Sequence, residues 1–170
     1  EVPCKQPDEG VTHFVIDHPR FAFYDRAAGR HLIYCPDPPG MPFAVDASKF
    51  ALFGVAVAEA IKEGVFGLLD CLHLHDWHTA FLFILRKYDP AYRSLQKIRA
   101  VFTIHNLVVQ GIRPWRGHES SFAAWYPDLR PNSVDLGDPK NTDCVNPMAA
   151  GIRLADAVHA VSPSYAEEIL

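Results

Sequence analysis

Histidine and acidic side chains gather in two short segments of this chain. The first segment covers residues 73–78 (HLHDWH), and the second covers residues 103–106 (TIHN). Each follows an apolar run that predicts a buried β-strand, and open α/β sheets bind ligands at the carboxyl ends of their strands. The two segments therefore predict one binding site, with Asp76 and His105 as its principal candidates.

A metal site is the first alternative for these residues. Cys71, His73 and His75 alternate along the first segment, and thiolate and imidazole are ligands that zinc prefers. However, alternate residues of one strand lie about 6 to 7 Å apart, which is longer than two ligands of one ion tolerate. We expect no metal and no other cofactor, and interpret His73 and His75 as hydrogen-bonded residues of the core or just behind the site.

The remaining polar residues each allow a structural interpretation. Asp76 stands where a strand passes into a helix, so its carboxylate can simply cap that helix, although its place at the ligand-binding edge favours a role in the site. Beside His105, Asn106 adds hydrogen-bond capacity. An aromatic ring at Trp77 or His78 either stacks on a sugar or packs the helix onto the sheet, and packing is favoured for Trp77.

Composition narrows the class of protein. A chain of 170 residues, 49% hydrophobic and 21% charged, has the size of one globular domain. Its net charge of −4 without a Lys/Arg run argues against nucleic acid as a partner. No apolar stretch is long enough to span a bilayer, and four scattered cysteines favour a reducing compartment. No GxSxG, Walker or GxGxxG motif supports a serine hydrolase or a simple nucleotide loop.

Strand and helix patterns alternate along the chain and predict an α/β fold with a Rossmann-like parallel sheet and flanking helices. Strands are predicted at 12–17, 68–74 (buried on both faces), 99–104 and 157–161, and helices at 77–88 and from Asp46 or Ser48 to Gly64. The segment up to Tyr34 is expected to be hairpin-like or irregular, and 36–42 a loop. Residues 111–145 are expected to form an excursion with one short helix near 121–126. Asn146 and Ser162 each precede a proline, as helix caps do.

Four blocks of the sequence resemble one enzyme family. Residues 75–80 (HDWHTA), 102–111 (FTIHNLVVQG), 146–156 (NPMAAGIRLAD) and 161–169 (VSPSYAEEI) are similar, in this order, to blocks of bacterial glycogen synthases and plant starch synthases. The resemblance implies a GT-B fold, in which two Rossmann-like domains face a cleft. It implies that residues 1–170 are a single, incomplete N-terminal, acceptor-side domain, and that the C-terminal nucleotide-sugar domain is absent from this sequence.

The resemblance also implies an activity and a set of site residues. The family transfers glucose from ADP-glucose to the non-reducing end of an α-1,4-glucan, with retention of configuration and without a metal. By position, His105 matches the active-site histidine, and Asp76 matches the acidic residue near the reacting sugar. Asn106, Gln110 and His78 are expected to line the substrate site, and Tyr34 is matched to a tyrosine that contacts sugar.

The departures from the family pattern limit what this chain can do alone. A Lys-x-Gly-Gly-Leu loop that contacts the donor nucleotide is missing from the sequence, and cations for the diphosphate belong to the other domain. We therefore expect the 170 residues to be inactive in isolation, to depend on their own C-terminal domain, and to self-associate through an exposed apolar sheet edge or face. The cytoplasm is the expected location, or the plastid for a plant protein. A non-catalytic glucan-binding or regulatory module is the alternative, and a metal-dependent hydrolase is less favoured.

Overall fold

The computed structural model describes residues 10–21 and 23–170. The chain divides into two compact units, Glu1–Cys35 and Pro36–Leu170, and each is described by itself. In the first, a 3-10 turn η1 (Pro19–Phe21) precedes the strands β1 (Phe23–Asp25) and β2 (Arg30–Leu32). These strands form the expected antiparallel hairpin, and the Asp25 carboxylate accepts the N–H groups of Ala27 and Ala28 in its turn.

The predicted strand at 12–17 does not form. Those residues have no regular secondary structure, and two of their apolar side chains, Phe14 and Val15, are 52% and 71% exposed. A strand is stable only when its backbone pairs with a neighbour, and residues 12–17 pair with none of the described strands. The prediction of a strand at 12–17 is therefore wrong.

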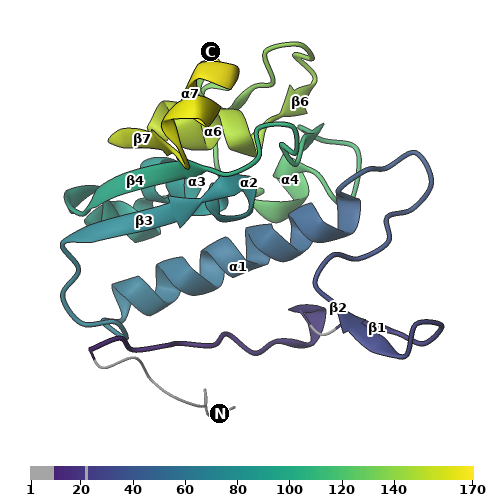
Figure 1. Cartoon of the computed structure of the whole chain (residues 1–170), viewed down its shortest axis with the longest axis horizontal. Coiled ribbons are helices and arrows are strands. Elements are labelled where there is room, and N and C mark those ends of the chain that lie inside the picture. The colour runs from purple at the N-terminus through teal and green to yellow at the C-terminus, as the bar shows by residue number, and fades with distance from the viewer. Residues whose placement is uncertain (1–9, 22) are drawn as a thin grey trace. The chain divides into compact units, whose positions relative to one another are not determined.

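The second unit contains a parallel sheet of three strands, β3 (Cys71–His75), β4 (Arg99–Ile104) and β7 (Ala157–Ala160). The strand order is β3-β4-β7, with both pairs parallel. The expected α/β class and the parallel pairing of the two predicted strands are therefore confirmed. Figure 1 shows the three strands side by side, with β4 in the centre.

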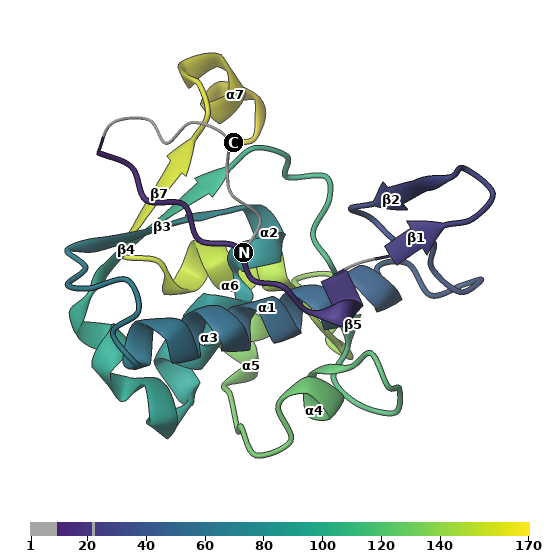
Figure 2. The same ribbon diagram turned by 90° about the horizontal axis from the view of Figure 1, so that it is seen from below.

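The helices that accompany this sheet are α1 (Ala44–Lys62), α2 (Asp76–Thr79), α3 (Phe81–Tyr88), η2 (Pro90–Lys97), α6 (Pro147–Leu154) and α7 (Pro163–Glu168). Five consecutive residues of α3, Phe81–Leu85, are buried, and α1 packs against α3 in turn (Figures 1 and 2). The predicted helix at 77–88 is two helices, α2 and α3, which meet at Ala80. No helix among the described residues is long and apolar enough to cross a membrane.

The hydrophobic core lies on one face of the sheet. The side chains of Leu72 and Leu74 on β3 and of Phe102 on β4 are buried there. The rings of Phe83 and Phe102 meet edge to face at 5.6 Å, and Gly151 of α6 lies so close that a Cβ would come within 2.6 Å of the Phe102 ring. These contacts fix α3 and α6 against this face.

The opposite face of β3 is exposed, which corrects the prediction that this strand is buried on both faces. Burial alternates along it, and Cys71, His73 and His75 point away from the core. The reason is that the apolar residues of β3, Leu72 and Leu74, pack on the helix-covered side only, which leaves the alternate residues on the uncovered face.

Helix α1 begins two residues before the predicted cap Asp46. Its N-cap residue is Phe43, with a left-handed φ of 65°, and the Asp37 carboxylate accepts the N–H groups of Phe43 and Val45 at 2.6 and 3.0 Å. Asp46 instead lies inside the first turn, buried and 2.7 Å from the Lys49 ammonium. A cap supplied by a preceding loop, rather than by an adjacent residue, was not visible in the sequence.

Residues 111–145 contain more structure than the single predicted helix. The expected helix exists as α4 (Phe122–Trp125), capped by Ser121. The segment also forms α5 (Ser133–Leu136) and a short antiparallel pair, β5 (Arg113–Pro114) with β6 (Cys144–Val145). The two predicted proline-bearing caps are confirmed, since the side chains of Asn146 and Ser162 accept backbone N–H groups of α6 and α7.

Candidate active site

The carboxyl ends of β3 and β4 lie next to each other, as the sequence predicted. In the parallel register His75 is paired with Thr103, so Asp76 comes one residue after this pair and His105 two residues after it. The two polar segments 73–78 and 103–106 therefore meet at one edge of the sheet.

The carboxylate of Asp76 joins these two strand ends. Its Oδ1 accepts the backbone N–H groups of His105 and Asn106 at 2.8 and 3.2 Å. Asp76 has a left-handed φ of 54°, a conformation that aspartate tolerates better than most residues. Its second oxygen, Oδ2, makes no hydrogen bond to any described residue, so it is available to accept a hydrogen bond from a ligand hydroxyl.

The imidazole of His105 is exposed and has one nitrogen engaged. Its Nε2 lies 2.9 Å from Nδ1 of His75, a hydrogen bond between two histidine rings. Its Nδ1 has no partner among residues 10–21 and 23–170. The site thus presents one carboxylate oxygen and one imidazole nitrogen at two neighbouring strand ends.

Further histidines continue from this pair across the exposed face of the sheet. The His73 ring lies 4.3 Å from the His75 ring, and His73 Nε2 is 2.6 Å from the hydroxyl of Thr103. That hydroxyl lies 3.2 Å from Nδ1 of His159 on β7. The prediction that His73 and His75 are hydrogen-bonded is confirmed, whereas a place in the core is wrong, because both side chains are exposed.

Desolvation is the main cause that lowers the pKa of His75 below its ordinary value. The positive charges that His73 and His105 would carry lower that pKa further, and the Asp76 carboxylate opposes both effects. The neutral imidazole is therefore favoured at His75.

Two amides shape the loop that follows β4. The Asn106 side chain accepts the N–H of Val108 at 3.0 Å, and Gln110 donates to the Leu107 carbonyl at 2.8 Å. Gln110 also accepts a hydrogen bond of 2.6 Å from Asn146. Both ends of the Gln110 side chain are thus used within the chain, whereas the Asn106 amide nitrogen has no described partner and is exposed.

Asn146 is a residue of this network that the sequence indicated only as a helix cap. It is 1% exposed, and its amide donates to Asp138 at 2.8 Å as well as to Gln110. Its carbonyl oxygen accepts the N–H of Ala149 at the start of α6. One side chain therefore ties the loop after β4 to α6 and to the excursion.

Trp77 packs in the core, as favoured by the sequence. It is 1% exposed, with the ring of Phe43 at 5.6 Å and that of Phe50 at 5.4 Å. Gly111, with φ of 68°, approaches so closely that a Cβ would come within 2.1 Å of the indole. No described residue accepts a hydrogen bond from the buried indole N–H.

His78 is half-buried beside Trp77. Its ring lies edge to face with Phe50 at 4.7 Å, and desolvation by this packing is the main cause that lowers its pKa. Tyr34 belongs to the first compact unit and the other five predicted residues to the second, so Tyr34 is described only as a 57% exposed side chain.

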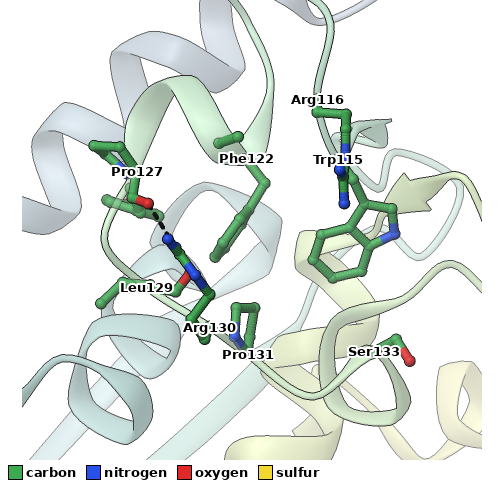
Figure 3. Close-up of a pocket in the computed structure, with 10 residues that line it drawn as sticks. Trp115, Arg116, Phe122, Pro127, Leu129, Arg130, Pro131 and Ser133 are labelled. Atoms are coloured by element: carbon green, nitrogen blue, oxygen red, sulfur yellow. Dashed lines mark hydrogen bonds between the residues drawn. The ribbon is translucent and has the colours of Figure 1, made fainter.

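A cavity of about 610 Å³ lies in the excursion, residues 111–145 (Figure 3). None of the six predicted site residues lines it. Trp115, Phe122 and Leu129 form apolar parts of its wall. The Arg130 guanidinium at its edge donates to the carbonyls of Pro127 and Leu129. No motif in the sequence indicated this cavity.

The chemistry of the strand ends suits an uncharged polyol. Residues 73–78 and 103–110 contain hydrogen-bonding groups but no Lys or Arg. Nor do any three His, Cys, Asp or Glu side chains within the described part of the chain form a group that could hold a metal ion. Sugar hydroxyls can be bound here, whereas a diphosphate would need cations from elsewhere.

Comparisons with known proteins agree on one family. Residues 2–170 match the family model described as the starch synthase catalytic domain. A glycogen synthase of Bacillus cereus (strain B4264) is 34% identical over 97% of this chain and 31% of its own length. A glycogen synthase of Streptococcus equi subsp. equi is 38% identical over 73% of this chain and 25% of its own length.

One solved structure has a similar fold. The catalytic domain of starch synthase IV from Arabidopsis thaliana, bound to ADP and acarbose, matches with a TM-score of 0.61 and 28% identity. The match covers 81% of this chain and 26% of that one. The chain thus spans about a quarter to a third of the length of the relatives it matches.

Proposed function

Because the chain belongs to the starch synthase catalytic domain family, we propose that it forms the sugar-contacting wall of a retaining glucosyltransferase active site. The whole enzyme moves glucose from ADP-glucose to the non-reducing end of an α-1,4-glucan. The observation that carries the proposal is the joining of Asp76 to the backbone of His105 and Asn106. It places a carboxylate oxygen and an imidazole nitrogen at one strand edge, where both can bind the glucose being transferred.

The roles of the site residues follow from their free hydrogen-bonding groups. The unpaired Nδ1 of His105 and Oδ2 of Asp76 bind hydroxyls of the donor glucose, and the amide nitrogen of Asn106 adds a donor. Gln110 contributes by shaping the loop through its bonds to Leu107 and Asn146. His78 holds its place through packing on Phe50 and reaches a ligand only with its exposed edge.

The negative charge of the leaving group supports the proposal that this chain alone has no activity. When the acceptor hydroxyl displaces ADP from the anomeric carbon, negative charge develops on the diphosphate and must be stabilised. The strand ends contain no cationic side chain. We therefore propose that residues 1–170 act as an N-terminal domain, with a second, nucleotide-sugar domain supplying the cations, and that the isolated chain is inactive.

The substrates are proposed from the relatives. The starch synthase IV domain is bound to ADP and to acarbose, an adenine nucleotide and an oligosaccharide analogue, and the glycogen synthases are named for a glucan product. We propose ADP-glucose and an α-1,4-glucan for this protein, and the cytoplasm as its location. We further propose that the free edges of β3 and β7, each of which pairs with β4 only among the described strands, allow copies of the isolated chain to associate.

The test uses this chain joined to a second domain of the family. Transfer of radiolabelled glucose from ADP-glucose to glycogen is expected for the whole protein and not for the 170 residues alone. Asp76→Asn and His105→Ala should each lower kcat/KM by at least tenfold, whereas Asp70→Asn, an exposed change in front of β3, should leave it unchanged. Glucan binding without any transfer by the whole protein would instead favour the non-catalytic module.

A further inference from the structure

The side chain of His75 touches the candidate active-site histidine but has no role in the proposal above. Its ring lies 5.2 Å from that of His105, tilted by 42°, with Nδ1 and Nε2 at 2.9 Å. The main chain of His75 is held by Thr79, whose hydroxyl accepts its N–H at 2.7 Å and donates to its carbonyl at 2.8 Å. His75 is thus a fixed partner at the end of β3.

The hydrogen bond between the two rings limits which atoms carry protons. A neutral histidine has one N–H and one bare nitrogen, so exactly one proton lies between His75 Nδ1 and His105 Nε2. If that proton belongs to His105, its outer nitrogen, Nδ1, is an acceptor. If it belongs to His75, then Nδ1 of His105 carries a proton and is a donor.

We propose that His75 is a positioning residue that keeps the proton of His105 on Nε2, so that Nδ1 of His105 accepts a hydrogen bond from a sugar hydroxyl. In this arrangement both rings carry their proton on Nε2, which is the more stable tautomer of a free neutral histidine side chain. The use of Nδ1 as a sugar acceptor rests on the proposed function. The choice of tautomer does not, because it follows from the pairing of the two rings together with the greater stability of the Nε2–H form on each ring.

One added proton would reverse the arrangement. With three protons on the pair, one lies between the rings and the other two occupy the outer nitrogens, including Nδ1 of His105. The groups that face the pair are His73, Asp76 and, across Thr103, His159. At His75, burial and the neighbouring histidines oppose protonation, and Asp76 favours it. A single protonation therefore turns the acceptor into a donor.

Imidazole NMR tests the tautomer without any assay of activity. Long-range ¹H–¹⁵N spectra of the 170-residue chain near pH 8 should show His105 protonated on Nε2 only. In His75→Leu, which removes the polar partner, His105 should become a mixture of both tautomers. In His75→Asn, whose side-chain oxygen can occupy the position of Nδ1 and accept the hydrogen bond, His105 should stay protonated on Nε2, whereas His75→Gln, whose amide lies farther out, should give the mixture.

A matched control lies on the same face of the sheet. His159→Asn alters a histidine that is bonded to Thr103 and not to His105, so the spectrum of His105 should stay as in the unchanged chain. The proposal is overturned if His105 carries its proton on Nδ1 in the unchanged chain, or if His75→Leu and His75→Gln leave its tautomer unaltered. His75→Gln serves for the comparison if His75→Leu does not fold.

A kinetic measurement on the two-domain protein separates this proposal from the proposed function. His75→Leu should lower kcat/KM about tenfold and alter the acid side of its pH profile, and His75→Asn should restore the activity to within about threefold, since a tenfold change corresponds to the ~1.4 kcal/mol of one hydrogen bond. If the unchanged protein transfers no glucose, the proposed function fails. The NMR result still decides the role of His75.

Discussion

Asp76 performs two structural tasks with one residue. Its backbone makes a left-handed turn between β3 and α2, and its carboxylate accepts two N–H groups from the end of β4. Most L-residues are strained in that conformation, and asparagine and aspartate are the exceptions among residues with a side chain. Very few replacements can therefore satisfy both requirements.

We predict that Asp76→Ala lowers the free energy of unfolding by roughly 2–3 kcal/mol, because it loses a charged acceptor and places an alanine at positive φ. Asp76→Asn keeps an acceptor and the tolerance for this φ, so it should cost only about 1 kcal/mol. Urea denaturation followed by circular dichroism measures both. Asp70→Ala, which removes an exposed carboxylate before β3, should change stability by less than about 0.5 kcal/mol; an equal loss there would contradict the argument.

The histidines of the site make stability depend on pH. Desolvation lowers the pKa of both His75 and His78 below 6.5 in the folded protein. As pH falls through 6.5, the unfolded chain takes up protons before the folded chain does, so the folded state loses stability. This contribution is complete above pH 6.5 and is lost as pH falls through the lowered pKa values.

His78→Phe should therefore reduce the loss of stability between neutral and mildly acidic pH, since phenylalanine keeps the packing on Phe50 without a titrating group. Urea midpoints at several pH values give the comparison. The same change at His31, an exposed histidine of the β1–β2 hairpin, is the control. A pH dependence that is unchanged in His78→Phe would show that burial of this ring does not contribute.

At the scale of elements, close packing between α6 and β4 fixes the helix on the sheet. A Cβ on Gly151 would lie 2.6 Å from the Phe102 ring, so no larger residue fits without movement. Gly151→Ala should cost about 1–3 kcal/mol of unfolding free energy. Combined with Phe102→Leu, which opens space at the same point, it should cost less than the sum of the two single changes, by at least ~0.5 kcal/mol. Strict additivity in the double-mutant cycle would contradict this contact.

The elements that sequence predicted best are those with strong local signals. The strand at 99–104 agrees with β4 residue for residue, and the caps Asn146 and Ser162 are where proline and a capping side chain indicated them. The strands β5 and β6 have only two residues each, which is too short for any periodicity to appear. The cap of α1 by Asp37 is a contact across six residues that no local pattern contains.

The candidate site, too, could be predicted from the sequence only in part. Asp76 and His105 could be brought together from the sequence because parallel strands end at one edge of a sheet. The ring-to-ring bond between His75 and His105 could not, because it depends on the rotamers of two exposed side chains. Gln110 was expected to bind substrate, and only its partners Leu107 and Asn146 reveal its part in the loop.

At the scale of the whole molecule, the chain consists of a small hairpin unit and a larger unit that holds the sheet and five of the six predicted site residues. The exposed face of β3 is polar, with two histidines, so it does not supply the apolar face that was expected to drive association. Any association of the isolated chain is therefore expected at the free edges of β3 and β7, and size-exclusion chromatography at several concentrations would detect it.

One hydrogen bond connects the last helix to the loop of the site. The hydroxyl of Tyr165 on α7 accepts the backbone N–H of Leu107 at 2.8 Å. In Tyr165→Phe, we expect the Leu107 amide to exchange with deuterium at least about tenfold faster, since one lost hydrogen bond of ~1.4 kcal/mol changes an opening equilibrium by that factor. The exchange rates of the amides in β4 should stay the same. A similar increase in rate at all amides would mean that the change destabilises the whole fold.

That bond links the local order of the loop to the order of α7. The Asp76 carboxylate holds the beginning of the loop, through the N–H groups of His105 and Asn106, and Tyr165 holds its middle. A change that loosens α7 is therefore expected to loosen the segment that follows β4 as well. The local stability of the strand ends then depends on a helix that lies much later in the sequence as well as on the residues beside them.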